Sequence, residues 1–140
     1  MISVKKIDLR YSDTDQMGVI YHANYLSFFE QGRTKFYKDV GYKYHETEES
    51  GVIFPVREVN VKYVRAARLG EEIRIETRIH EITKIKVVYY HEMYNEKDEL
   101  KSKGYTTVVS VDKDTFKTVR MNERLPDVYN DYIRIKAESK

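Results

Sequence analysis

The chain contains no cysteine, only two prolines and only two glutamines, and it has no long apolar run. The absence of cysteine excludes disulfide bonds, thiolate catalysis and a cysteine-based zinc site. No apolar stretch approaches the roughly 20 residues that a membrane-spanning helix needs, and residues 1–5 lack the layout of a signal peptide. We therefore expect a cytoplasmic protein without a membrane span.

A strong excess of one charge is also absent. The formal net charge is +2 at pH 7, whereas a nucleic-acid-binding protein usually carries a clustered basic stripe, so we expect no nucleic-acid partner. The chain has 140 residues, of which 41% are hydrophobic and 34% charged, as is typical of a globular protein. This predicts a single domain over residues 1–140, long enough to bury a core. Many of the 13 tyrosines must be half-buried or lie at an interface.

The longest helical pattern follows a short polar segment near the N-terminus. Five residues recur at helical spacing on one face: Tyr25, Phe29, Gly32, Phe36 and Val40. This spacing predicts a well-buried α-helix that begins between residues 21 and 25 and ends at Val40. Gly32 on the apolar face indicates a close approach to a sheet, and Gly41 stands where helices favour a left-handed cap.

The start of this helix is its chemically interesting end. Asn24 is a favoured N-cap residue, so the unpaired N–H groups of the first turn point toward the preceding segment. That segment carries Asp13 and Asp15, followed by a turn through Gly18. A carboxylate beside N–H donors at the positive end of a helix dipole suits a nucleophile or general base next to an oxyanion site. From the residues alone, an ordinary Asx turn is the better interpretation.

Alternation of apolar and polar residues predicts antiparallel strands over most of the remaining chain. The expected strands cover residues 3–11, 52–68, 73–80, 85–94 and 105–111, with a short last strand at 116–120. Residues 42–51 have no clean period and predict a loop or a short helical turn, whereas the stretch after Pro126 fits a short amphipathic helix. One long helix with a run of antiparallel strands is an α+β layout. Because strand 85–94 is apolar on both faces, it needs a second cover, so we expect a homodimer or homotetramer.

A motif covers the segment before the helix and its first turn. It reads Asp15-x-x-Gly18-Val19-Ile20-x-His22-x-Asn24-Tyr25, preceded by Arg10-Tyr11 and followed by Glu30 and Arg33. This motif resembles the active-site segment of the 4-hydroxybenzoyl-CoA thioesterase family and, within it, of the YbgC-type acyl-CoA thioesterases. The resemblance implies the hotdog fold, in which an antiparallel sheet wraps one long central helix. It also implies active sites between subunits and hydrolysis of an acyl-CoA without a cofactor.

The resemblance assigns roles to four residues. Asp15 matches the catalytic acid, which acts as a general base toward water or as the nucleophile itself. His22 matches the position whose backbone N–H meets the thioester oxygen. Gly18 is interpreted as the turn residue, and we expect it and Tyr25 at the substrate. The four histidines are scattered without ligand spacing, so no metal site is predicted.

Some interpretations stay open at this level. The acyl group could come from acyl carrier protein instead of coenzyme A, or the domain could bind acyl-CoA without cleaving it. Asp13 is predicted to be a solvated turn carboxylate, and the basic second strand to be a solvated face. The chain departs from the family pattern where relatives carry Pro-Ala and Gly-Asp, since it has Ala66-Ala67 and Gly70-Glu71. These differences bear on local turn geometry and substrate preference.

Overall fold

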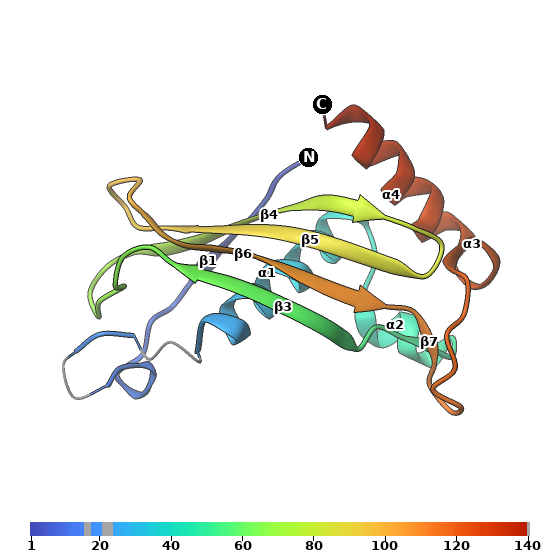
Figure 1. Cartoon of the computed structure of the whole chain (residues 1–140), viewed down its shortest axis with the longest axis horizontal. Helices are drawn as coiled ribbons and strands as arrows, with labels where there is room; N and C mark the ends of the chain where they lie inside the picture. The colour runs from blue at the N-terminus through green and yellow to red at the C-terminus, as the bar shows by residue number, and fades with distance from the viewer. Residues whose placement is uncertain (16–17, 21–23, 140) are drawn as a thin grey trace.

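The computed structural model of the chain describes residues 1–15, 18–20 and 24–139 (Figure 1). The elements run in the order β1 (Ser3–Ile7), η1 (Tyr11–Asp13), α1 (Asn24–Val40), α2 (Tyr44–Glu49), β2 (Val52–Ile53), β3 (Val56–Tyr63), β4 (Ile73–Ile82), β5 (Lys86–Tyr94), β6 (Leu100–Val109), β7 (Val111–Asp112), α3 (Met121–Arg124) and α4 (Pro126–Glu138). This is the predicted α+β composition.

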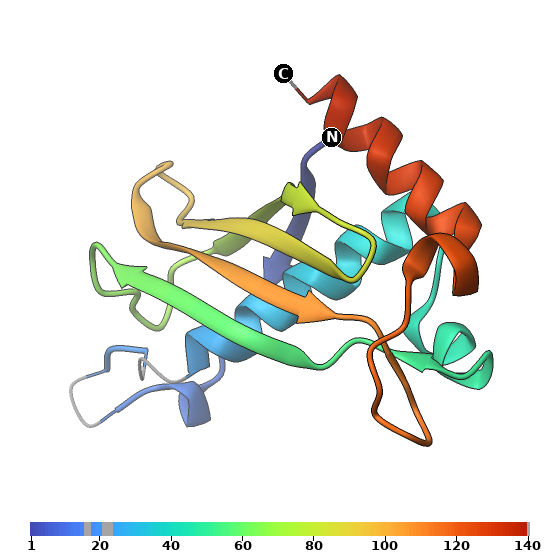
Figure 2. The same cartoon turned by 45° about the vertical axis from the view of Figure 1, so that its right-hand side comes forward.

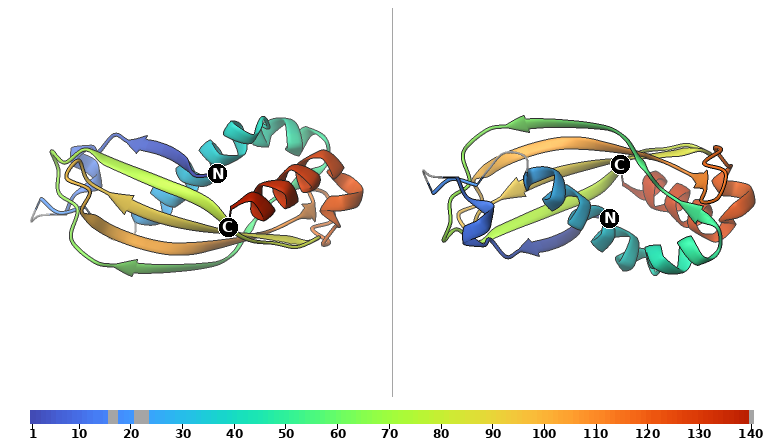
Figure 3. Two further views of the ribbon diagram at one scale, coloured as in Figure 1. Left: turned by 90° about the horizontal axis from the view of Figure 1, so that it is seen from above. Right: turned by 90° about the horizontal axis from the view of Figure 1, so that it is seen from below.

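The main sheet has five strands in the order β1-β4-β5-β6-β3, and every neighbouring pair is antiparallel. Helix α1 runs across one face of this sheet, while α3 and α4 lie at one end of it (Figures 1 and 2). The views from above and below show the same arrangement, with η1 at the end opposite α3 (Figure 3). Strands β2 and β7 form a separate two-stranded sheet. One long helix held against an antiparallel sheet is the arrangement that the hotdog prediction requires.

Helix α1 lies close against the sheet at Gly32, as the sequence predicted. A Cβ atom at this position would lie 2.5 Å from Thr77 Oγ1 and 3.0 Å from Ile75 Cγ2, so no side chain fits there. The helix ends at Val40, and Gly41 follows with a φ of +118°. The Gly41 N–H donates to the Lys38 carbonyl at 2.9 Å, which confirms the predicted cap.

The buried side chains form two clusters, one under each half of α1. The cluster under the N-terminal half contains Ile7, Ile20, Tyr25, Phe28, Phe29, Ala67, Ile73, Ile75 and Met93. The other contains Phe36, Tyr37, Ile79, Val87, Tyr89, Val108, Met121, Val128, Tyr132 and Ile135. The first cluster therefore supports the segment in which the motif lies, and the second seals the far end with α4.

Several predicted strand boundaries were wrong. The first strand ends at Ile7, and the chain then forms the short 3₁₀ helix η1. The long strand expected over residues 52–68 is split into β2 and β3 on either side of Pro55, which has no N–H for a ladder bond. Residues 116–120 form no strand and contribute only an isolated bridge between Val111 and Thr118. The predictions for residues 42–51 and for the stretch after Pro126 are confirmed. Residues 44–49 form the short helix α2, which was one of the two predicted alternatives, and α4 begins at Pro126.

Strand β5 has the two apolar faces that were predicted. Its inner side chains Val87, Tyr89 and Met93 are buried against the helices. On the outer face, the rings of Tyr90 and Tyr94 are half-buried beneath arginine side chains of β4, with each guanidinium carbon 4.8–4.9 Å from a ring centroid. The outer face is therefore partly covered by the chain itself.

A buried histidine lies under the closest approach of α1. His91 is 0% exposed, and its Nδ1 lies 2.9 Å from Thr77 Oγ1 while its Nε2 lies 3.2 Å from Thr106 Oγ1. Its ring stacks on Phe29 with the centroids 4.6 Å apart. Burial, and then the positive charge of Arg33, lower the pKa of His91 from 6.5 to about 3. His91 is therefore neutral in the folded protein at neutral pH.

This shift predicts a measurable pH dependence of stability. Between about pH 6.5 and pH 3 the unfolded chain binds a proton at His91 that the native protein does not, so stability is fully present above pH 6.5 and falls as the pH drops. The slope due to this residue approaches about 1.4 kcal/mol per pH unit. In urea unfolding, His91→Gln should be less stable than the parent at pH 7 but less sensitive to acid. The exposed His45→Gln is the control, and identical slopes for His91→Gln and the parent would contradict the prediction.

Candidate active site

Residues 14–15 and 18–20 lie side by side as the two arms of a small hairpin, which carries Asp15 on one arm and Gly18 on the other. Thr14 and Ile20 form an antiparallel bridge, and the Asp15 N–H donates to the Val19 carbonyl at 2.8 Å. In return, the Val19 N–H donates to Asp15 Oδ1 at 3.3 Å. The Asp15 side chain is exposed. The carboxylate therefore bonds to the opposite arm of its own hairpin and also remains accessible to a substrate.

Gly18 has the turn role that the sequence predicted. Its φ is +74°, in the left-handed region that favours glycine, and its N–H donates to the Asp15 carbonyl at 3.2 Å. Among the residues that the structure describes, none places a heavy atom within 4 Å of a Cβ atom at this position. The requirement for glycine is therefore one of backbone conformation and not of space.

Two roles predicted from the sequence need correction. Asp13 is buried, not solvated: its carboxylate accepts the Arg10 N–H at 2.9 Å and lies 3.5 Å from the Arg10 guanidinium, so it closes η1. Asn24 is the first residue of α1, and its side-chain amide donates to the Asp13 carbonyl at 2.9 Å. This bond uses the amide as a donor rather than as a capping acceptor, and it ties the start of the turn to the start of α1.

On its other side, the hairpin is bonded to residues 66–69. The Ile20 N–H donates to the Ala67 carbonyl at 2.8 Å, and the Leu69 N–H donates to the Gly18 carbonyl at 3.4 Å. The Ala67 N–H donates to the Tyr25 hydroxyl at 3.2 Å. These bonds link the hairpin, residues 66–69 and the first turn of α1 into one unit.

The other two predicted site residues differ in what can be said of them. Tyr25 lies in the core, where burial raises the pKa of its hydroxyl even though the bond from the Ala67 N–H acts in the opposite direction. Its ring centroid is 5.1 Å from that of Tyr63, and its contact with substrate stays a prediction. His22 lies outside the described residues, so its backbone N–H as the oxyanion donor also stays a prediction.

Polar side chains that the sequence analysis did not single out support residues 66–69. Lys101 and Asn95 are both buried and both contact the carboxylate of Glu71. The only signal for them in the sequence was Glu71 itself, which stands where relatives carry the Asp of Gly-Asp.

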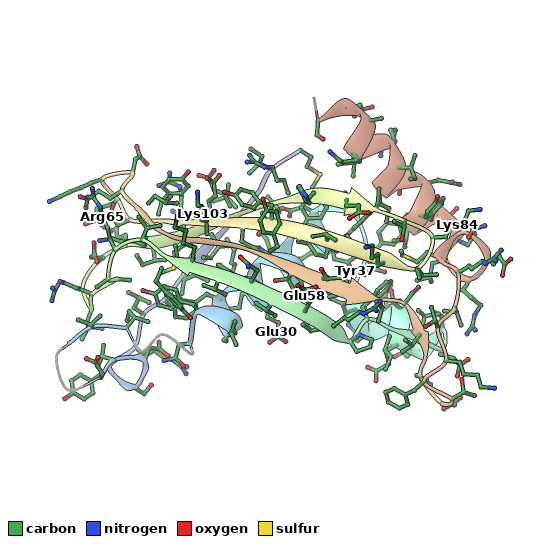
Figure 4. The ribbon with its side chains drawn as sticks, viewed as in Figure 1. Glu30, Tyr37, Glu58, Arg65, Lys84 and Lys103 are labelled. Carbon is green, nitrogen blue, oxygen red and sulfur yellow. The ribbon has the colours of Figure 1, made fainter. Side chains whose placement is uncertain are left out.

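Two basic residues near the second strand also lie at this end of the sheet. Arg65 pairs with Glu99 at 3.1 Å (Figure 4), and Arg68 is exposed beside Val19.

A polar groove adjoins the turn on the side of β1. It has a volume of about 370 Å³, and its lining includes Lys5, Lys6, Arg10, Asn24 and Gln31. The exposed turn therefore has charged and polar groups on two sides.

No helix among residues 1–15, 18–20 and 24–139 is both long and apolar enough to cross a membrane.

The fold and this turn define a hotdog-type protein with an acidic turn at the start of its central helix. The sequence profile of the Thioesterase-like superfamily matches residues 9–128. The putative acyl-CoA thioesterase YneP of Bacillus subtilis (strain 168) is 38% identical over 96% of this chain and 98% of its own length. The acyl-CoA thioester hydrolase YbgC of Escherichia coli O6:H1 is 32% identical over 73% of this chain and 76% of its own.

Solved structures agree with these relatives. The crystal structure of a DHNA-CoA thioesterase from Staphylococcus aureus matches 99% of this chain and 95% of its own, with a TM-score of 0.95 and 35% sequence identity. The chain therefore belongs to the thioesterase-like superfamily. The predicted YbgC-type family, the hotdog fold and the class of thioester hydrolase are confirmed.

The conformation of Gly18 leads to a prediction about activity. In Gly18→Ala, the left-handed backbone costs roughly 1–2 kcal/mol, which lowers the equilibrium constant for forming the native turn about tenfold. Turnover of a thioester substrate should fall by up to that factor while the fold is retained.

Gly41→Ala is the matched control for Gly18→Ala. Gly41 also has a positive φ and open space around its Cβ position, but it lies at the far end of α1. This variant should lose thermal stability and keep the turnover of its folded fraction. Equal turnover in Gly18→Ala and the parent would contradict the role of the turn.

Proposed function

We propose that the protein hydrolyses acyl-CoA thioesters and that Asp15 is its catalytic carboxylate. Water adds to the carbonyl carbon, the carbon–sulfur bond breaks, and the products are a free carboxylic acid and coenzyme A thiol. The observation that carries the proposal is the Asp15 turn, which is tied to the first residue of α1 in a chain of the thioesterase-like superfamily. The relatives named above carry the names putative acyl-CoA thioesterase and acyl-CoA thioester hydrolase.

The carboxylate can act in two ways. As a general base, Asp15 takes a proton from the attacking water and passes it to the departing thiolate. As a nucleophile, it forms an anhydride with the acyl group, which water then cleaves. In both routes negative charge develops on the thioester oxygen. The backbone N–H of His22 near the positive end of α1 is the proposed donor to that oxygen, with Gly18 and Tyr25 near the substrate.

The setting of the reaction is also part of the proposal. Residues 1–140 act as one thioesterase domain, supported by a single five-stranded sheet that packs against α1 throughout. A cytoplasmic location is in keeping with a coenzyme A substrate and with a chain that contains no cysteine. The resemblance implies that no cofactor takes part.

The function is tested directly with a panel of short, long and aromatic acyl-CoAs. Thiol release is followed colorimetrically without added metal, and the protein adds no background because it contains no cysteine. We expect at least one substrate to be hydrolysed, and the products to be the free acid and coenzyme A. No release across the panel, combined with tight acyl-CoA binding, would favour a binding module instead.

The role of Asp15 is tested by Asp15→Asn. Asn retains the size of Asp and an oxygen that can accept the Val19 N–H, so the turn should survive. It cannot act as a base, and kcat on the best acyl-CoA should fall by roughly 10² or more. KM should change little, because the remaining contacts to the substrate are preserved.

The control is the same change two residues earlier. In Asp13→Asn, the amide oxygen can still accept the Arg10 N–H, although the ion pair with Arg10 is lost. Asp13 is buried, but the Arg10 side chain is exposed, so solvent screens the ion pair and its loss should cost little. The loss of turnover should therefore be small. A larger loss in Asp13→Asn than in Asp15→Asn would overturn the assignment.

We also propose that the protein is a homo-oligomer and that β3 forms an interface between two copies. Strand β3 is bonded to β6 on one side, and no strand among the described residues pairs with its other edge over residues 56–62. Its side chains Val56, Val59 and Tyr63 are exposed. A long edge with exposed apolar side chains favours pairing with another strand. The outer face of β5 supports a second interface more weakly, because arginines partly cover it.

Light scattering at micromolar protein should therefore give at least twice the mass of one chain. Val59→Lys should weaken the association, because it places a charge on the β3 edge. Val4→Lys is the matched control, since Val4 is an exposed valine on β1, at the opposite edge of the same sheet. A monomeric parent, or equal effects of the two variants, would refute β3 as the interface.

A further inference from the structure

Residues 64–71 lie between the end of β3 and the start of β4, where the regular ladder does not hold them. They nevertheless carry three of the bonds that fix the hairpin and the first turn of α1, through Ala67 and Leu69. The position of the Asp15 turn therefore depends on whatever holds residues 64–71.

Lys101 of β6 forms hydrogen bonds with three consecutive residues of this segment. Its carbonyl accepts the Val64 N–H at 2.9 Å and the Arg65 N–H at 3.0 Å. Its ammonium group donates to the Ala66 carbonyl at 3.2 Å and lies 3.0 Å from Glu71 Oε2. The backbone and the side chain of Lys101 thus act on the same stretch.

A β-bulge gives Lys101 this position. In the pairing of β5 with β6, Met93 lies opposite Ser102 and Tyr94 lies opposite Leu100, so Lys101 is the extra residue. Bulges of this kind re-aim a side chain and often lie next to active sites. The Lys101 side chain is only 8% exposed. A buried ammonium is costly unless it is paired and hydrogen-bonded, and here it has both a carboxylate and a carbonyl.

Glu71 holds the other end of the segment. Its Oε1 accepts the Arg68 N–H at 2.7 Å, and its Oε2 accepts the Asn95 side-chain amide at 2.7 Å. Burial alone would raise the pKa of Glu71, but the bonds from Asn95, from the Arg68 N–H and from Lys101 outweigh it and lower the pKa. The carboxylate is therefore ionised at neutral pH, and both of its oxygens are engaged by donors.

We propose that Lys101 and Glu71 are positioning residues that set the place of the Asp15 turn through residues 66–69. Stability alone does not explain the pair, since a buried ion pair is often no more stabilising than well-packed apolar residues. Its bonds converge on the stretch that adjoins the turn. The inference about activity rests on the proposed function, whereas the inference about position does not.

The first test compares kinetics. Lys101→Met removes the ammonium, and Glu71→Gln replaces one acceptor oxygen with an amide that opposes either the Arg68 N–H or the donors of Lys101 and Asn95. Each variant should lower kcat by roughly 10–100-fold, the scale of a misplaced reacting group, with KM changed by less than about threefold. The double variant should lose less than the product of the two single effects, because the residues act as a unit.

Conservative and remote variants separate positioning from general destabilisation. Glu71→Asp shortens the side chain but keeps the carboxylate and both of its acceptor oxygens. It should therefore retain more kcat than Glu71→Gln. Lys86→Met removes the partner of Glu81 at the opposite end of the sheet and should leave kcat unchanged. If Lys101→Met does not fold, Glu71→Gln and Glu71→Asp carry the test. Parental kcat in folded Lys101→Met and Glu71→Gln would overturn the proposal.

The second test does not use activity. In hydrogen exchange followed by NMR on the full chain, the Ile20, Ala67 and Leu69 amides should exchange faster in Lys101→Met. The Ser110 and Val119 amides, which are bonded at the other end of the molecule, should keep their parental rates. If the parent cleaves no acyl-CoA but these rates change as expected, the proposed function fails and the positioning role stands. If the parent is active and the rates do not change, the positioning role fails.

Discussion

The contact between Gly32 and the sheet is the constraint on which the rest of the structure depends. Because the side chains of Thr77 and Ile75 occupy the space that a Cβ atom of this residue would need, the backbone of α1 lies directly against the side chains of the sheet. That depth brings Phe29 onto the ring of His91 and Phe36 onto the ring of Tyr89. Because interiors are close-packed, a shift of α1 would disturb both buried clusters at once.

The depth of α1 also determines where its first turn lies. Tyr25 reaches the Ala67 N–H, and Asn24 reaches the Asp13 carbonyl. The chemistry proposed for Asp15 therefore rests on a chain of contacts that begins in the core: helix on sheet, first turn on residues 66–69, and those residues on the hairpin. The turn itself is exposed and short, so its position is fixed by its bonds to buried neighbours.

Polar groups in the interior serve this arrangement in two different ways. Around His91, two threonine hydroxyls satisfy a neutral ring, so the buried ring carries no charge. At Lys101 and Glu71, two charges are placed at the rim of the sheet with their donors and acceptors engaged. At His91, no ion is desolvated because the ring is neutral. At Lys101 and Glu71, two ions are desolvated, and their bonds fix residues 64–71, which lie outside the regular strands.

Local patterns in the sequence determined a large part of this structure. The spacing from Tyr25 to Val40 predicts α1, and Gly32 and Gly41 predict its contact and its end, because helical periodicity and glycine conformation are short-range properties. The motif from Asp15 to Tyr25 predicts the family and the hotdog fold. Only the tertiary structure decided which charges meet across the sheet.

No local pattern indicated that Asp13 is buried, that Asn24 bonds backward to the turn, or that Lys101 reaches Ala66 and Glu71. These contacts join residues up to 35 positions apart. They depend on strand order and on a bulge in β6, and neither is contained in the periodicity of any one segment.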